Sequence, residues 1–162
     1  MRKLMMSSLV SLLVLILIGV ESISAQDAIS VDKPVVEVQV EQGLLKSPKD
    51  GRLYVLFSKS LTREPRQGPS WFGPEPFYGL DLKAVGDGNT YVLDDESDGF
   101  PDAISKLTAG TYAVQAIFDH DFYHSNHNNG VGNIYSDKVV VDWKPTERRV
   151  FTTQAVTCAY HY

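Results

Sequence analysis

Two runs of sequence, GTYAVQAIFD (residues 110–119) and YSDKVVVDW (residues 135–143), decide the fold class of this chain. Both are rich in the β-branched and aromatic residues that favour strands. A polar insert from Asp119 to Gly130 joins them and carries three of the chain's four histidines. We therefore expect two strands joined by a polar loop.

Strand signals recur at short intervals on both sides of this unit. Residues 35–40 alternate apolar with polar, and residues 52–57 form an apolar run that suits a central strand, with a turn signal at Lys49-Asp50-Gly51. Four prolines between residues 61 and 76 exclude a helix or a central strand there. Further elements are expected at residues 78–85, 90–93 and 149–160 (strands) and 103–107 (one helical turn). The sequence thus predicts an all-β chain, with an immunoglobulin-like antiparallel β-sandwich over residues 34–162.

The first 25 residues have the layout of a secretory signal peptide. Arg2 and Lys3 precede an apolar run from Leu9 to Val20, and Ser24 and Ala25 offer cleavage sites. The alternative is an uncleaved anchor, but the run from Leu4 to Val20 is short for the roughly 20 apolar residues of a spanning helix. We expect cleavage, a flexible segment at residues 26–33, and a secreted or periplasmic protein that meets the membrane only if the signal segment is retained.

The charge of the chain argues against one class of partner, and its cysteine content excludes an internal disulfide. The formal net charge is -5 and no run of Lys or Arg follows a phosphate backbone, so we expect no nucleic-acid partner. Cys158 is the only cysteine, so an internal disulfide is excluded. We expect Cys158 to be a small hydrophobic residue on an edge strand.

The insert contains the densest group of candidate metal ligands. Imidazole and carboxylate groups together suit zinc, but their spacing matches no established zinc motif. The neighbouring asparagines and glycine are turn formers, so a soluble polar loop is the alternative. The candidate ligands are Asp119, His120, Asp121, His124 and His127.

A second acidic segment, residues 94–102, resembles the opening of a calcium loop. Acidic residues occupy its first, third and fifth positions before a glycine, but position twelve is Ser105 and no helices flank the loop. The alternative is an acidic surface turn, so we expect no cofactor, with calcium or zinc as the alternative. The candidate calcium ligands are Asp94, Glu96, Asp98 and Asp102.

Aromatic residues in and after the proline-rich stretch form a candidate binding surface. Exposed rings there could stack on sugar rings or dock another domain, whereas the alternative is that they cover an open end of the sandwich. The residues are Trp71, Phe72, Phe77 and Tyr78.

The sequence predicts no catalytic residue. It lacks the Gly-x-Ser-x-Gly motif, and the nearest approach at residues 68–73 is one residue too long and lacks a strand-turn-helix context. With three of four histidines in one loop, a serine, a histidine and an acid would meet only by accident. A hydrolase acting in its own right is the weakest alternative.

Several short motifs occur in a recognisable order between residues 35 and 143. They include GRLYV (51–55), EPR (64–66), PEPFYGLD (74–81), GFP (99–101), GTYAVQA (110–116) and NIYS (133–136). In this order they resemble the N-terminal β-sandwich domain of secreted bacterial esterases of the enterochelin-esterase-like group.

The resemblance implies an accessory role without catalysis. In that group the catalytic serine, acid and histidine lie in an α/β-hydrolase domain that follows the sandwich, and no residue of this sequence corresponds to them. The implied partners are a hydrolase domain or protein, or a glycan or peptide bound through the aromatic segment. The alternative function is a metal-dependent extracellular binding protein.

Overall fold

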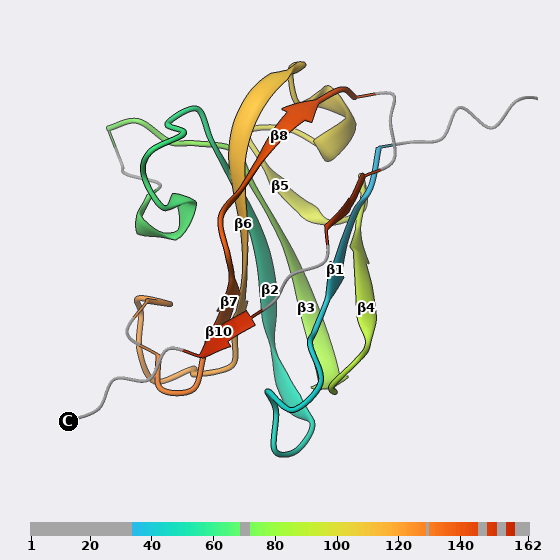
Figure 1. Cartoon of the computed structure of the whole chain (residues 1–162), viewed down its shortest axis with the longest axis vertical. Helices are drawn as coiled ribbons and strands as arrows, with labels where there is room; N and C mark the ends of the chain where they lie inside the picture. The colour runs from blue at the N-terminus through green and yellow to red at the C-terminus, as the bar shows by residue number, and fades with distance from the viewer. Residues whose placement is uncertain (1–33, 69–71, 129, 146–148, 152–154, 158–162) are drawn as a thin grey trace, which may run out of the picture.

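The structure is a computed structural model of the chain (Figure 1), and it describes residues 34–68, 72–128, 130–145, 149–151 and 155–157. Within these ranges the chain forms strands and two 3-10 turns. The strands are β1 (Val36–Gln39), β2 (Lys49–Ser58), β3 (Phe77–Val85), β4 (Thr90–Leu93), β5 (Asp98–Phe100), β6 (Gly110–Asp119), β7 (Ile134–Ser136), β8 (Val139–Trp143), β9 (Arg149–Phe151) and β10 (Ala155–Thr157). The 3-10 turns are η1 (Pro65–Gln67) and η2 (Ile104–Lys106).

The strands form two sheets. The small sheet has the order β4-β1-β9, and the large sheet has the order β10-β7-β6-β2-β3-β5, with β8 also paired to β6. Neighbouring strands run antiparallel, except that β1 and β9 are parallel. The prediction of an all-β chain with antiparallel sheets is confirmed, apart from this one parallel pair.

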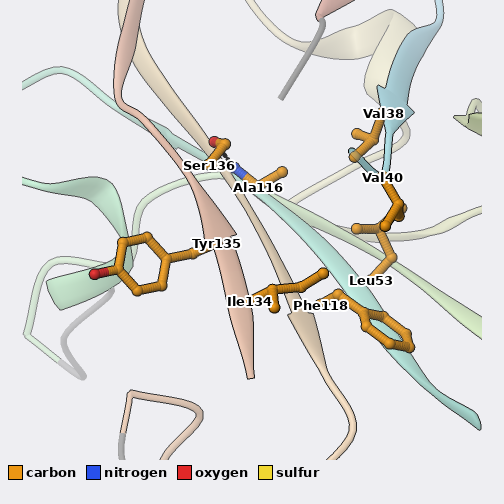
Figure 2. Close-up of a pocket in the computed structure, with 8 residues that line it drawn as sticks. All are labelled: Val38, Val40, Leu53, Ala116, Phe118, Ile134, Tyr135 and Ser136. Atoms are coloured by element: carbon orange, nitrogen blue, oxygen red, sulfur yellow. Dashed lines mark hydrogen bonds between the residues drawn. The ribbon is translucent and has the colours of Figure 1, made fainter. Parts of the chain in front are cut away.

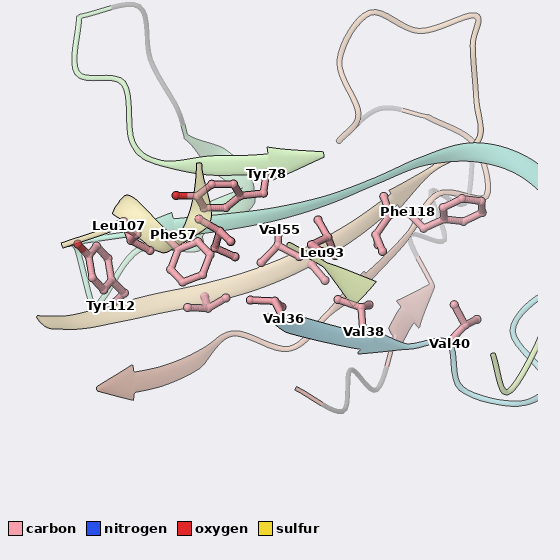
Figure 3. Packing of buried hydrophobic residues seen from close by; sticks show 14 of the residues in the cluster. Val36, Val38, Val40, Val55, Phe57, Tyr78, Leu93, Leu107, Tyr112 and Phe118 are labelled. Carbon is pink, nitrogen blue, oxygen red and sulfur yellow. The ribbon is translucent and has the colours of Figure 1, made fainter. Parts of the chain in front are cut away.

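The core lies between the two sheets (Figure 3). Leu53, Val55 and Phe57 of β2 occupy alternate positions and are buried in one cluster with Val36 and Val38 of β1. Because successive side chains of a strand point to opposite faces, the residues between them face away from this core. The alternation therefore gives the large sheet one apolar inner face and one outer face.

Aromatic rings fill one end of this core. Phe57 is completely buried, and its ring lies edge-on to those of Tyr78, Tyr112 and Trp143, with centroid distances of 5.7, 5.7 and 5.4 Å. Edge-to-face pairs at this spacing are favourable because the positive edge of one ring meets the negative face of the other. The four rings come from four strands of the large sheet, and they tie these strands together.

The turn predicted at Lys49-Asp50-Gly51 is wrong, because these residues open β2. A register shift marks a bulge between Lys49 and Gly51, and the Asp50 carboxylate accepts a hydrogen bond from the backbone N–H of Ala84. A Cβ on Gly51 would lie 2.5 Å from the carbonyl oxygen of Asp119, so only glycine fits. Glycine here serves a bulge and a close approach between strands rather than a turn.

The single strand predicted at residues 135–143 is divided into β7 and β8. They follow one another along the same edge of β6, which pairs with β8 in its N-terminal half and with β7 near its C-terminal end. At the division the hydroxyl of Ser136 accepts the backbone N–H of Ala116 at 2.9 Å, so a side chain replaces a backbone hydrogen bond.

The last strand, predicted at residues 149–160, is also divided. β9 pairs with β1 in the small sheet, whereas β10 pairs with β7 in the large sheet. The C-terminal region therefore contributes an edge to each sheet, which a single strand cannot do.

Some of the predicted features lie outside the described residues. These are the signal peptide (1–25), the flexible segment (26–33) and Cys158. Within the described residues, no helix has the length and hydropathy to cross a membrane.

Candidate binding face

Two loops cover the outer face of the large sheet (Figure 1). One is the proline-rich loop, residues 59–68 and 72–76, whose 3-10 turn η1 contacts β2 and β6. The other is the insert, which in the structure extends from the end of β6 to the start of β7 (residues 120–128 and 130–133). Its His127 ring lies 6.2 Å from the ring of Tyr54 on β2. We call the surface formed by these two loops the loop face.

The side chain of Gln115 connects the sheet to the proline-rich loop. It projects from the middle of β6 and is only 1% exposed. Its Oε1 accepts the backbone N–H of Arg66 at 3.0 Å, and its Nε2 donates to Glu64 at 2.7 Å and to the Ser136 carbonyl at 2.8 Å. A buried amide that makes three hydrogen bonds fixes the loop at a defined height above the sheet.

Arg66 joins the proline-rich loop to the insert. Its guanidinium donates to the Asn128 side chain at 3.0 Å, while its own carbonyl accepts hydrogen bonds from Asn128 at 2.8 Å and from His127 at 3.0 Å. The guanidinium carbon also lies 4.2 Å from the centroid of the Tyr135 ring. Its Nε is buried without a hydrogen-bond partner, with Glu64 Oε2 at 3.8 Å. The two loops are thus held together as one surface.

Asn133 holds the ends of the insert together. This residue is buried, and its Oδ1 accepts the backbone N–H groups of His120 and Asp121 at 2.9 and 3.1 Å. Its Nδ2 donates to the Asp119 carboxylate at 2.7 Å and to the His127 carbonyl at 2.9 Å. One asparagine therefore uses both ends of its amide to shape the insert.

The Asp121 carboxylate organises the interior of the insert. It accepts the backbone N–H groups of Tyr123 and Val131 at 2.9 and 2.8 Å and the Nδ1 of His124 at 2.6 Å. The hydrogen bond from the Tyr123 N–H, followed by that from His124, lowers the pKa of Asp121 below its ordinary value. Asp121 is therefore ionised at neutral pH and its oxygens are already occupied.

The structure places the three histidines of the insert against different partners. His124 bonds Asp121, His127 bonds the Arg66 carbonyl, and the Nε2 of His120 lies 2.7 Å from the Gly132 carbonyl. In the described part of the chain, no three His, Cys, Asp or Glu side chains are placed to hold a metal ion. Of the five predicted ligands, His120, Asp121 and His124 border the same depression, and the metal site stays a prediction.

The four predicted calcium ligands have different surroundings. Asp94 accepts the backbone N–H of Glu96 at 2.9 Å, as in an ordinary Asx turn, while Asp98 in β5 pairs with Arg52 of β2. Asp102 and Glu96 are exposed. An acidic surface turn accounts for these contacts, and calcium binding stays a prediction.

The four residues of the predicted aromatic surface differ in their exposure. Phe72 is fully exposed, and Phe77 is half-buried and stacked on Phe100 with 5.6 Å between centroids. Trp71 lies outside the described residues. The prediction that Tyr78 lies on a binding surface is wrong, because its side chain is buried in the core. This burial raises the pKa of Tyr78 to about 12. It follows Phe77 in a strand and therefore points to the opposite face of the sheet.

Two hollows in the described part of the molecule differ in size, one a small cavity and the other an open depression. The cavity lies between the sheets, has a volume of about 10 Å³ and is lined mainly by apolar side chains (Figure 2). It is no larger than one water molecule needs. The depression lies on the insert, has a volume of about 440 Å³ and is lined by His120, Asp121, Tyr123, His124 and Val131. Of these two, the depression has the size of a ligand site.

Sequence reasoning missed the residues that build the loop face. Gln115 had a detectable signal, because a polar residue inside a long apolar strand must find partners. Arg66 gave no comparable signal, since its partners Gln115 and Asn128 are distant in sequence. The partners of the Asn133 side chain lie 6 to 14 positions away, but no sequence motif pairs it with them. Phe122 and Tyr123, whose rings are exposed, were not singled out because the histidines of the same segment suggested a metal site.

Comparison with known proteins adds no identification to this geometry. No protein-family model, no curated protein and no solved structure matches the chain.

Proposed function

We propose that this protein is an exported, non-catalytic binding domain with an immunoglobulin-like β-sandwich fold, similar to the N-terminal domain of enterochelin-esterase-like proteins. One observation supports a binding role above all. The rings of Phe72, Phe122 and Tyr123 are exposed to solvent on the loop face, with Phe122 at 76% and Tyr123 at 97%.

Exposed rings of this kind favour a ligand over a structural role. A large aromatic side chain is normally buried, because its transfer out of water is favourable. Here three rings remain in water, although the loops that carry them are bonded to the sheet through Arg66, Gln115 and Asn133. A surface fixed before binding loses little conformational entropy when a ligand docks. The loop face therefore has the physical character of a binding site.

The polar groups of the loop face do not support catalysis. Asp121 and His124 form a carboxylate–imidazole pair, as in many hydrolases. Within the described residues, however, no serine, threonine or cysteine side chain is hydrogen-bonded to His124. A pair without such a side chain lacks the nucleophile that covalent catalysis of the serine-hydrolase kind requires.

The remaining parts of the proposal come from the sequence. The signal-peptide layout of residues 1–25 supports export to the periplasm or the medium. The resemblance supports a partnership with a hydrolase domain or protein, and the exposed rings support a glycan or peptide ligand.

A binding screen with matched variants tests the proposal. The purified chain is screened against a glycan array and a phage-displayed peptide library, together with a loop variant (Phe72→Ala, Phe122→Ala, Tyr123→Ala). The control is Val92→Ala, which removes an exposed side chain from β4 of the small sheet. We expect ligands that the loop variant loses and the control retains.

Two results would contradict the proposal. One is the absence of any ligand that depends on the loop residues. The other is turnover of p-nitrophenyl esters by the chain, since a binding domain has no such activity.

A further inference from the structure

The depression on the insert combines an exposed ring with fixed polar groups. Tyr123 is almost completely exposed at its border, and Val131 at 71% exposure adds a second apolar surface. His120, Asp121 and His124 supply the polar part of the lining. A site of this kind offers a ring for stacking beside directional hydrogen-bonding groups.

The hydrogen bonds within the insert fix which atoms of the two imidazoles remain available. The Nε2 of His120 faces the Gly132 carbonyl, which only accepts, so this nitrogen carries a proton. The Nδ1 of His124 likewise donates to the ionised Asp121. In their neutral forms, both rings therefore keep one unprotonated nitrogen that accepts hydrogen bonds.

The lining also restricts the charge of a ligand. It contains no lysine or arginine, so nothing in it neutralises a phosphate, sulfate or carboxylate. The oxygens of Asp121 already accept three hydrogen bonds, so this carboxylate does not call for a cationic partner. The complementary ligand is neutral, donates hydrogen bonds and has a face that stacks on an aromatic ring.

We propose that the depression binds a neutral carbohydrate, with a pyranose ring stacked on Tyr123 and its hydroxyl groups donating to the free nitrogens of His120 and His124. The weakly positive C–H groups on one face of a pyranose complement the negative face of an aromatic ring. Sugar hydroxyls supply hydrogen-bond donors for the unprotonated nitrogens of the two imidazoles. This inference rests on the proposed binding function and names the ligand class and the part of the loop face that takes it.

The depression is rigid enough to select a ligand by shape. Asn133 and Asp121 bond four backbone N–H groups of the insert, those of His120, Asp121, Tyr123 and Val131. These bonds hold both histidines and Tyr123 on one short, closed segment. A preorganised site of this kind gains affinity because little order is lost on binding.

Affinity gel electrophoresis of the full chain tests the inference. The gels contain xylan, mixed-linkage β-glucan, galactomannan or amylose as neutral polysaccharides, and alginate as an acidic one. Isothermal titration calorimetry with an oligosaccharide of the best ligand then gives Kd for the wild type, Tyr123→Ala, Tyr123→Phe, His124→Ala and Val92→Ala. Melting curves confirm that each variant is folded.

We expect retardation by at least one neutral polysaccharide and none by alginate. Tyr123→Ala should raise Kd about tenfold or more, because the stacking surface is lost. Tyr123→Phe keeps the ring and should stay near the wild type, as should Val92→Ala. His124→Ala should weaken binding by several-fold, because one acceptor is removed.

Three outcomes overturn the inference. They are binding that Tyr123→Ala leaves unchanged, binding to alginate alone, and no binding to any polysaccharide. If no polysaccharide binds but a phage-selected peptide depends on the loop residues, the carbohydrate inference fails and the proposed binding function stands. If neither class of ligand binds, both fail.

Discussion

The guanidinium group of Arg66 lies over the ring of Tyr135, 4.2 Å from its centroid. Arg66 belongs to the proline-rich loop and Tyr135 to β7, and the same guanidinium donates to Asn128 of the insert at 3.0 Å. A single side chain therefore contacts both loops and the sheet beneath them. This contact makes the loop face one surface rather than two independent loops.

Replacing Arg66 should loosen both loops. Arg66→Ala removes the hydrogen bond to Asn128 and the cation–π contact, so we expect a loss of about 1–2 kcal/mol in the free energy of unfolding. Amide hydrogen exchange of the insert should also become faster. Arg66→Lys keeps the charge but not the planar guanidinium group, so its stability should lie between those of the wild type and Arg66→Ala. Arg63→Ala, which breaks an exposed ion pair with Glu75, should cost less than about 1 kcal/mol and leave exchange in the insert unchanged.

Replacing Gln115 with an apolar residue should destabilise the protein, although the site is buried. Gln115→Leu leaves the Arg66 N–H and the Ser136 carbonyl without this partner in a buried site. We expect about 2–3 kcal/mol of destabilisation in urea unfolding. Gln67→Leu, an exposed glutamine nearby, should change stability by about 0.5 kcal/mol or less. Equal effects of the two substitutions would show that the buried amide holds nothing in place.

The central strands could be predicted from sequence because their signal is local. The apolar run at residues 52–57 lies in β2, and the run at residues 110–119 forms β6, as expected. The errors arise where the signal is not local. Gly51 resembles a turn residue until Asp119, far along the chain, is placed against it. Residues 135–143 resemble one strand until the Ser136 hydroxyl interrupts the pairing with β6.

The location of the candidate site could be predicted in part, but its construction could not. The insert was identified by its histidines, and Tyr123 and His124 lie within it. The bonds that shape it join distant residues: Arg66 and Asn128 are 62 positions apart, and Arg66 and Gln115 are 49 apart. No spacing rule connects such pairs before the fold is known.

The acidic segment at residues 94–102 gives a prediction about calcium. Asp94 bonds the N–H of Glu96, and Asp98 is held by Arg52 on another strand, so bringing them to one ion would break both contacts. We expect 5 mM calcium chloride, or 5 mM EDTA, to leave the melting temperature unchanged within about 1 °C. A rise with calcium that Asp98→Asn abolishes would contradict this and restore the calcium loop.

The Asp121 carboxylate gives a prediction about pH. Its folded-state pKa lies below the value of about 3.9 for an unfolded aspartate. The stability that it contributes is therefore present above pH 4 and is lost as the pH falls through the folded-state pKa. We expect the difference in melting temperature between the wild type and Asp121→Asn to be largest near pH 6 and to shrink below pH 4. The exposed Asp137→Asn should show a small difference throughout, and a constant gap for Asp121→Asn would contradict the assignment.

Replacing a phenylalanine should destabilise the protein strongly in the core and very little on the loop face. Phe57 is completely buried among the rings of Tyr78, Tyr112 and Trp143, whereas Phe122 is 76% exposed on the insert. Phe57→Ala leaves a cavity that four strands cannot close, so we expect a loss of about 3–5 kcal/mol in urea unfolding. Phe122→Ala removes a ring that already lies in water and should change stability by about 0.5 kcal/mol or less. A large loss for Phe122→Ala would mean that its ring supports the fold, and the argument that this exposed ring is kept for a ligand would then fail.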